Sequence, residues 1–302
     1  MPTPTASPAP VTRTLDLGDA TLTYDVRGAL PPSDDDEPPL VLIGHPMDAS
    51  GFTSLAAHLA DRTLVTTDPR GVGRSPRRDG LVDHDPVRQA DDLHALVTAL
   101  VDGPADVFAS SGGAVTALAW AARHPGDLRT VVAHEPPILT VLPDAEAALA
   151  AERAVQATYR ARGWGAGMAH FIALTSWQGE FGDAFAAAPA PDPTELGLPA
   201  EDDGARDDPL LSGASNAITA HDLQVDALGV DALRTTGTRL VIAAGIESAG
   251  TVTWRTAAAV AQAVGLPLVE FPSHHGGFLG GEFGQHGQPE AFAARLRDVL
   301  GA

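Results

Sequence analysis

Two adjacent serines lie where the chain changes from a predicted strand to a predicted helix. The apolar run at 105–110 has the length of a buried strand, and the apolar positions of 114–125 recur at helical spacing. Between them the sequence reads ASSGG, at 109–113. A serine on a sharp turn of this kind can act as a nucleophile, because the turn exposes its hydroxyl at the end of a sheet.

Ser111 is the better candidate of the two serines. A nucleophile at this turn needs small residues two positions before and two positions after it, so that the strand and the helix can pass close together. Ser111 has Ala109 and Gly113 in these places, whereas Ser110 has the bulky Phe108 before it. The alternative, a glycine-rich helix start with serine as its N-cap, does not require small residues on both sides. We therefore predict Ser111 as the nucleophile.

The elements that must position this turn follow a regular order. Strand-like apolar runs alternate with segments of helical periodicity, which predicts an α/β fold with a mostly parallel sheet and helices on both of its faces. Eight strands are expected, at 14–18, 20–26, 39–44, 62–68, 105–110, 128–135, 238–245 and 267–271.

One long stretch, 137–236, interrupts the alternation because it contains no good strand and has a helical pattern at 145–162. We predict a helical cap, or lid, inserted into a core formed by 13–136 and 237–302, with 1–12 as a flexible tail. Four aromatic residues of the lid are expected either to contact an apolar group of a substrate or, as the favoured interpretation, to pack within the lid. They are Trp164, Phe171, Trp177 and Phe181.

The chain resembles the α/β-hydrolase fold family over nearly its whole length. The resemblance is carried, in order, by LVLIGHPMDASGF (40–52), RTLVTTDPRGVGRS (62–75), FASSGGAVTALAWAARHP (108–125) and FPSHHGGF (271–278). It implies an eight-stranded sheet, a helical lid, and a triad of serine, acid and histidine in that order along the chain. Because the nucleophile position holds Ser and not Asp, dehalogenase and epoxide hydrolase chemistry is not expected.

The resemblance places the general base after the last predicted strand, where His274 and His275 follow one another. A serine hydroxyl is a poor nucleophile until a neutral imidazole takes its proton. We favour His275, because Gly276 and Gly277 leave a mobile loop around it. Other histidines of the chain are interpreted as structural, namely His45, His58, His94, His124, His170 and His221.

Two carboxylates compete for the role of the acid. The resemblance places the acid three residues beyond the glycine that ends the strand at 238–245, but that position holds Ser248, and Glu247 is one residue away. Glu135 ends the strand at 128–135, where a subset of the family keeps a Glu whose longer side chain reaches the same imidazole. We favour Glu135 and keep Glu247 as the alternative. The other interpretation of each is a solvated or loop-bonded carboxylate.

An oxyanion hole needs two N–H donors directed at one oxygen. Gly112, the residue after the nucleophile, supplies the first. The resemblance places the second at Pro46, which has no N–H. Either Met47 donates instead or the loop is reshaped. His45 lies beside this position and either contacts the substrate or faces water.

The composition restricts partners and cofactors. Asp and Glu total 39 against 19 basic residues, and the net charge of −20 repels nucleic acid and anionic membranes. The chain has no Cys, which excludes thiol catalysis and Cys-ligated metals, and its acidic runs lack the ligand spacing of a calcium loop. It also contains no membrane-length apolar run and no signal-peptide pattern. We expect a cytoplasmic protein without metal or cofactor.

These expectations combine into one hypothesis, a cofactor-independent serine hydrolase that cleaves a carboxylic ester, of an apolar small molecule, through an acyl-enzyme. Ser111 is the expected nucleophile, His275 the base and then the acid, and Glu135 the carboxylate that holds the imidazole. The alternatives are hydrolysis of another acyl group or of a carbon–carbon bond by the same triad, and a non-catalytic member of the fold that binds a ligand.

Overall fold

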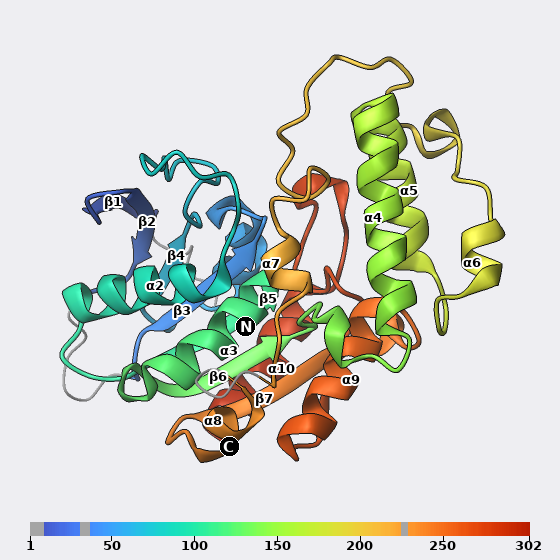
Figure 1. Ribbon diagram of the computed structural model, residues 1–302. Coiled ribbons are helices and arrows are strands. Elements are labelled where there is room, and N and C mark those ends of the chain that lie inside the picture. The colour runs from blue at the N-terminus through green and yellow to red at the C-terminus, as the bar shows by residue number, and fades with distance from the viewer. Residues whose placement is uncertain (1–8, 31–36, 225–228) are drawn as a thin grey trace, which may run out of the picture.

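The computed structural model describes residues 9–30, 37–224 and 229–302. An eight-stranded sheet forms its centre, with the strands in the spatial order β1-β2-β4-β3-β5-β6-β7-β8 (Figure 1). The strands are β1 (Val11–Asp16), β2 (Thr21–Arg27), β3 (Leu40–His45), β4 (Leu64–Thr67), β5 (Ala105–Ser111), β6 (Leu128–His134), β7 (Arg239–Gly245) and β8 (Leu268–Phe271).

Strands β1 and β2 form an antiparallel hairpin, and β2 pairs antiparallel with β4. The five remaining pairings, from β4 across to β8, are parallel. The prediction of a mostly parallel sheet with eight strands is therefore confirmed. Strand β1 begins at Val11, which pairs with Val26, so the sheet starts two residues before the predicted core boundary at 13. Most of the predicted tail, residues 1–8, lies outside the described residues.

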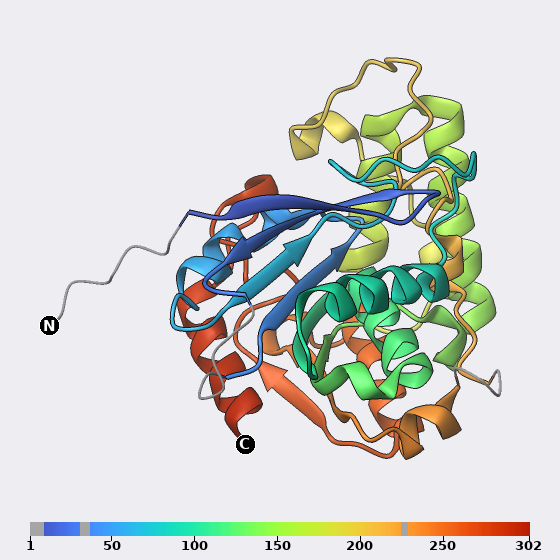
Figure 2. The same cartoon turned by 90° about the vertical axis from the view of Figure 1, so that its left-hand side faces the viewer.

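Helices cover both faces of the sheet, as predicted. The apolar sides of α2, α3 and α9 pack on one face, and those of α1 and α10 pack on the other. Figure 2 shows the red helix α10 on the opposite side of the sheet from the teal helix α2. The helices of the core are α1 (Thr53–Ala57), α2 (Pro86–Leu100), α3 (Gly112–Arg123), α9 (Val252–Val264) and α10 (Pro289–Gly301). A short 3₁₀ turn lies next to four of these helices in the chain, at η1 (Ala49–Phe52), η2 (Pro125–Asp127), η5 (Ile246–Ser248) and η6 (Glu282–Gly284).

The segment between β6 and β7 has helices and 3₁₀ turns and no strand, over its described residues 137–224 and 229–236. Its elements are η3 (Leu139–Val141), α4 (Ala145–Arg162), α5 (Trp164–Ser176), α6 (Asp183–Ala187), η4 (Pro193–Leu196), α7 (Asn216–Thr219) and α8 (Val230–Thr235). Helices α4 and α5 pack side by side and stand beside the sheet (Figure 1). Gly167 allows this approach, because a Cβ atom there would lie 2.7 Å from the Cβ of Tyr159.

The lid has an apolar cluster of its own, which includes Tyr159, Leu174, Phe185 and Leu211 and reaches Val252 of α9. All four lid aromatic residues considered above belong to this cluster or pack against it, with Phe181 buried and the other three partly buried. The favoured interpretation of these aromatic residues, as lid core, therefore agrees with their packing. In the described ranges, no helix combines the length and the apolar character needed to cross a bilayer.

Candidate active site

The turn between β5 and α3 holds Ser111 in a rare backbone conformation. Its φ is 57° and its ψ is −132°, outside the regions that L-residues normally occupy. A Cβ atom on Gly113 would lie 2.8 Å from both the Cα of Gly44 and the carbonyl oxygen of Ile43, because the start of α3 presses against β3. The small residue expected two positions after the nucleophile is therefore required by a backbone contact. Ala109, two positions before it, is fully buried.

The two serines of the turn have different surroundings. Ser110 is buried at 2% exposure, and its Oγ lies 3.4 Å from Nδ1 of His134 on the neighbouring strand β6. Ser111 is partly exposed and ends the strand beside His45 of β3. Successive residues of a strand point to opposite faces, so the two side chains point in different directions. Ser110 is buried in the interior, whereas Ser111, the last residue of β5, lies partly exposed at the carboxyl edge of the sheet.

The structure brings His275 and Glu135 together. Nδ1 of His275 lies 2.6 Å from Oε2 of Glu135, which is fully buried directly after β6. The hydroxyl of Thr253 donates to the same oxygen at 2.5 Å, and the backbone N–H of Gly245 donates to Oε1 at 2.9 Å. Three donors thus hold this carboxylate in one orientation. Glu135 reaches this place from a backbone with a φ of 50°.

Burial by itself raises the pKa of the Glu135 carboxyl, but the hydrogen bond and the positive charge that His275 can supply bring this pKa well below its usual range. A carboxylate accepts hydrogen bonds and does not donate them, so Nδ1 of His275 carries the proton between the two residues. The other ring nitrogen, Nε2, is then free to accept a proton. This is the tautomer that a serine nucleophile needs in its base.

The alternative candidates for these two roles make other contacts. Glu247 lies exposed in η5, where its carboxylate accepts hydrogen bonds from Ser273 Oγ and Gln288 Nε2, both at 3.3 Å. His274 turns its ring toward its own loop, with Nε2 3.2 Å from the carbonyl oxygen of His286. Of the two adjacent histidines, His275 is thus the one that contacts a buried carboxylate.

The loop after β3 differs from the expectation. The strand continues to His45, one residue beyond the predicted end. The three atoms nearest to a Cβ placed on Gly112 all belong to His45, including its carbonyl oxygen at 3.0 Å. The side chain of Met47 folds over Gly44 and Gly51, where added Cβ atoms would lie 2.6 and 2.1 Å from its Cε and Sδ atoms. A donor role for the N–H of Met47 stays a prediction, and the residue that borders Gly112 is His45.

The possibility that His45 faces water is wrong. The residue is 2% exposed, and its Nε2 lies 2.6 Å from Nδ1 of His84, which is also buried. Sequence reasoning did not single out His84. It precedes α2 in a loop that carries no motif, and 39 positions separate it from its partner, so no local signal pointed to the contact.

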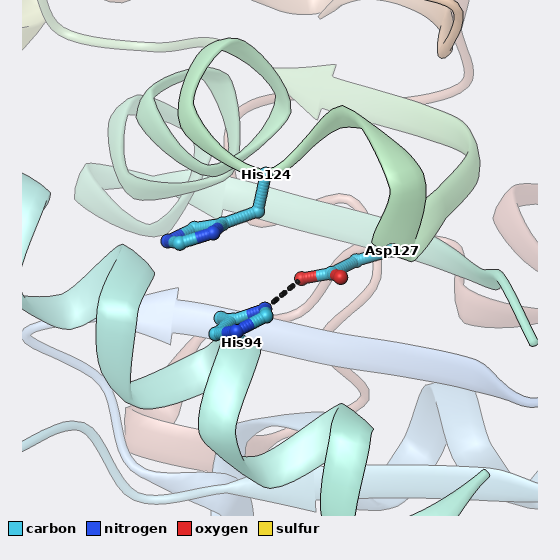
Figure 3. A group of neighbouring side chains, drawn as sticks. All are labelled: His94, His124 and Asp127. Atoms are coloured by element: carbon cyan, nitrogen blue, oxygen red, sulfur yellow. Dashed lines mark hydrogen bonds and ion pairs between the residues drawn. The ribbon is translucent and has the colours of Figure 1, made fainter. Parts of the chain in front are cut away.

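A second histidine cluster lies away from this site, where α2 meets the end of α3 (Figure 3). His94 Nδ1 lies 2.7 Å from Oδ2 of Asp127, which also accepts from Trp120 Nε1 at 2.7 Å, and His124 Nε2 lies 2.7 Å from Asp91. The two imidazole rings stack 4.0 Å apart at 6°. Their lone pairs lie in nearly parallel planes and do not converge on one ion, and each ring already has a carboxylate partner. We assign this cluster to joining α2 and α3, and not to metal binding.

Comparisons with known proteins agree with the architecture. The family model described as the alpha/beta hydrolase fold matches residues 38–161. A curated relative, "Uncharacterized hydrolase YraK" of Bacillus subtilis (strain 168), is 36% identical over 132 residues, which are 43% of this chain. The match spans 46% of that relative, somewhat less than half of its length.

Solved structures match over nearly the whole chain. An esterase from Thermogutta terrifontis has a TM-score of 0.59 at 19% identity, over 97% of this chain and 98% of the esterase. The enol-lactonase of Burkholderia xenovorans LB400 has a TM-score of 0.60 at 18% identity, over 96% and 100%. A Pseudomonas aeruginosa protein provisionally named an epoxide hydrolase has a TM-score of 0.64 at 20% identity, over 99% and 98%. Together with the sheet order and the β5–α3 turn, these matches show that the chain has the α/β-hydrolase fold.

Proposed function

We propose that this protein is a cofactor-independent serine hydrolase that cleaves a carboxylic ester through an acyl-enzyme. The observation that carries the proposal is the 2.6 Å contact between His275 Nδ1 and the buried carboxylate of Glu135. This contact leaves Nε2 of the imidazole available to the hydroxyl of Ser111, which stands at the strained turn between β5 and α3. The hydrolase name of the Bacillus subtilis relative supports the same class of reaction.

In the first half of the reaction, Ser111 Oγ attacks the ester carbonyl carbon while its proton passes to Nε2 of His275. The negative charge that develops on the carbonyl oxygen is stabilised by the N–H of Gly112, which is one of the free N–H groups at the start of α3. The imidazolium is stabilised by Glu135 and then gives its proton to the leaving alcohol. The acyl group remains on Ser111.

In the second half, a water molecule loses a proton to the same Nε2 as its oxygen bonds to the acyl carbon. The proton then returns to Ser111 Oγ as the bond between the acyl group and the serine breaks, and the carboxylic acid leaves. The names of similar structures include an esterase and an enol-lactonase, whose substrates both contain an ester bond. The substrate proposed here is accordingly a small ester. The lid aromatic residues do not indicate the nature of the substrate, because they pack in the lid core.

A fluorophosphonate probe and a panel of chromogenic esters of increasing acyl length test this proposal. The wild-type protein should be labelled and should hydrolyse at least one ester. Ser111→Ala should abolish labelling and lower turnover by about 10⁶-fold, because the triad loses its nucleophile. Ser110→Ala is the matched control and should retain most of both activities. An unlabelled wild-type protein without turnover would instead indicate a non-catalytic member of the fold.

A further inference from the structure

The pair formed by His45 and His84 lies beside the candidate nucleophile, on the side away from Glu135. Strand β5 has β3, which ends at His45, on one side and β6, which precedes Glu135, on the other. The two imidazole rings of the pair lie at 64° to each other, with centroids 4.7 Å apart. Both residues are buried, at 2% and 6% exposure. The proposed hydrolytic steps make no use of either side chain.

The ring of His45 has one nitrogen directed to each neighbour. Its Nε2 contacts Nδ1 of His84 at 2.6 Å. Its Nδ1 lies 2.9 Å from the place that a Cβ atom on Gly112 would take. Any side chain at position 112 would therefore collide with this imidazole. The Nδ1 edge of His45 thus borders the residue whose N–H is expected to bind the oxyanion.

Both rings are neutral in the folded protein at neutral pH. Burial lowers the pKa of His45 well below its usual range, and the neighbouring His84 lowers it further. Burial also lowers the pKa of His84, assisted by the charge of Arg77 and opposed by that of Asp83. A neutral imidazole has one N–H, and the short contact between the rings holds one proton. When His84 donates that proton, the N–H of His45 must be on Nδ1, facing Gly112.

We propose that the Nδ1–H of His45, oriented by His84, is a side-chain donor of the oxyanion hole. This inference rests on the proposed hydrolase function and adds a donor to it. The loop after β3 would supply this hydrogen bond although Pro46 offers no N–H. His45 is then a catalytic residue, because it touches the developing oxyanion, and His84 is a positioning residue.

The main chain holds His84 independently of its side chain. Its backbone N–H donates to the carbonyl oxygen of Ala214 in the lid segment before α7, at 2.8 Å. The next residue, Asp85, caps α2 by accepting from the N–H of Val87 at 2.9 Å. Substitutions of the His84 side chain therefore leave both of these backbone anchors in place, and they test the contact with His45 alone.

Amide side chains can separate the two nitrogens of each ring. The amide of Asn replaces a group at the Nδ1 position, and the longer Gln replaces one at Nε2. His45→Asn keeps a donor facing Gly112, whereas His45→Gln keeps only the contact with His84. His84→Asn keeps a partner for His45, whereas His84→Gln withdraws it. His58→Gln, an exposed site at the end of α1, is the control for a histidine-to-amide change.

The measurements are kcat and KM on the best ester of the panel, with fluorophosphonate labelling and a thermal melt. His45→Gln should lower kcat by about 100-fold with little change in KM, because a donor to the transition state is lost. His45→Asn should retain at least about tenfold more activity than His45→Gln. His84→Gln should lower kcat more than His84→Asn does, because only Asn keeps a group at the Nδ1 position that contacts His45. The control His58→Gln should match the wild type.

Three outcomes would overturn the proposal while leaving the hydrolase function intact. The first is an active wild-type protein in which His45→Gln keeps normal kcat. The second is a larger loss in His45→Asn than in His45→Gln. The third, which decides the matter if His45→Gln does not fold, is equal kcat in His84→Asn and His84→Gln. Absence of labelling and turnover in the wild-type protein would overturn the proposed function itself.

Discussion

Backbone strain in this protein gathers at the candidate catalytic residues. Among the described residues, four that are not glycine have a positive φ, and three of them are Ser111, Glu135 and Ser273, two positions before His275. Such conformations typically cost about 1–3 kcal/mol each and persist where the surrounding structure enforces them. Ser111 is fixed by the packing of α3 on β3, and Glu135 by three hydrogen-bond donors. Strained backbone therefore occurs where side chains are positioned in the candidate site, at a cost in local stability.

The carboxylate assignment leads to a pair of opposed expectations. Glu135→Gln should keep the fold but lower turnover by about 10⁴-fold, because the amide no longer fixes the imidazole tautomer or stabilises its cation. Glu247→Gln should change the rate by less than about tenfold, as its exposed carboxylate contacts Ser273 and Gln288 and not His275. Both variants are assayed on one ester, with thermal melts to detect unfolding. A large loss at Glu247 beside a near-normal Glu135 variant would transfer the role to Glu247.

At the scale of elements, apolar periodicity was enough to predict the architecture. The eight strands are short apolar runs bounded by turn residues, and their starts and ends lie within two residues of the predicted ones, except that β1 starts three residues earlier. The turn at Ser111 was predictable as well, because small flanking residues are a local requirement. Expectations for Ser111, Gly112 and Gly113 all derive from a single stretch of sequence.

Features that depend on distant contacts were less accessible from the sequence. The sequence favoured Glu135 over Glu247 only through the resemblance, and the contact that supports this choice joins Glu135 to His275, 140 positions away, which no spacing encodes. The contact between His45 and His84 joins a strand end to a loop with no motif. The short lid helices α6, α7 and α8 have only four to six residues, too few for a helical period to be recognised, so tertiary contacts decide the backbone there. In each case the missing information is a long-range partner.

The close packing of α3 on β3 can be tested through Gly113. Gly113→Ala should destabilise the protein by about 1–3 kcal/mol and lower kcat, because the added methyl group meets backbone atoms of Ile43 and Gly44 that cannot yield without moving the helix. Gly103→Ala, where a Cβ atom would have nothing within 4 Å, is the control and should be close to neutral. Urea unfolding and ester turnover measure the two effects. Equal stability of both variants would contradict the contact.

The cluster in Figure 3 is expected to act as a clamp between α2 and α3. Asp127→Ala leaves the indole N–H of the buried Trp120 and the ring of His94 without their acceptor, and should cost about 1–3 kcal/mol of unfolding free energy. Asp231→Ala, at a side chain that is 93% exposed, is the control. Zinc should leave the melting temperature of the wild type unchanged. A rise in that temperature that is lost in Asp127→Ala would instead identify a metal site.

At the scale of the whole molecule, arginines that lie between carboxylates partly offset the repulsion among the excess acidic residues. The net charge is −20. Arg70 hydrogen-bonds to Asp19 at 2.7 Å and to Asp92 through two nitrogens. Arg74 contacts Asp25 and Asp68, each at 2.9 Å. Both arginines belong to the segment that follows β4, so the network ties this turn to the β1–β2 hairpin and to α2.

Arg74 gives the test at this scale, because its removal leaves two buried carboxylates without their cation. Burial alone raises the pKa of Asp25 and of Asp68, but their contacts with Arg74 bring both below the usual value. Groups with a lowered pKa stabilise the fold fully above the unfolded pKa of about 3.9, and this contribution is lost as the pH falls through the folded pKa. Arg74→Met should therefore lower the free energy of unfolding by about 2 kcal/mol at pH 7, a value reduced by the half-exposed position of Arg74. This loss should shrink as the medium becomes acidic, because the two carboxyls then bind protons.

Urea unfolding at neutral pH and at a pH below the unfolded pKa measures both losses. The control is Arg123→Met, in an exposed pair with Asp91, which should lower the free energy of unfolding by less than about 1 kcal/mol. A loss at Arg74 that stays the same at both pH values would mean that the arginine stabilises the turn by packing and not through the two carboxylates.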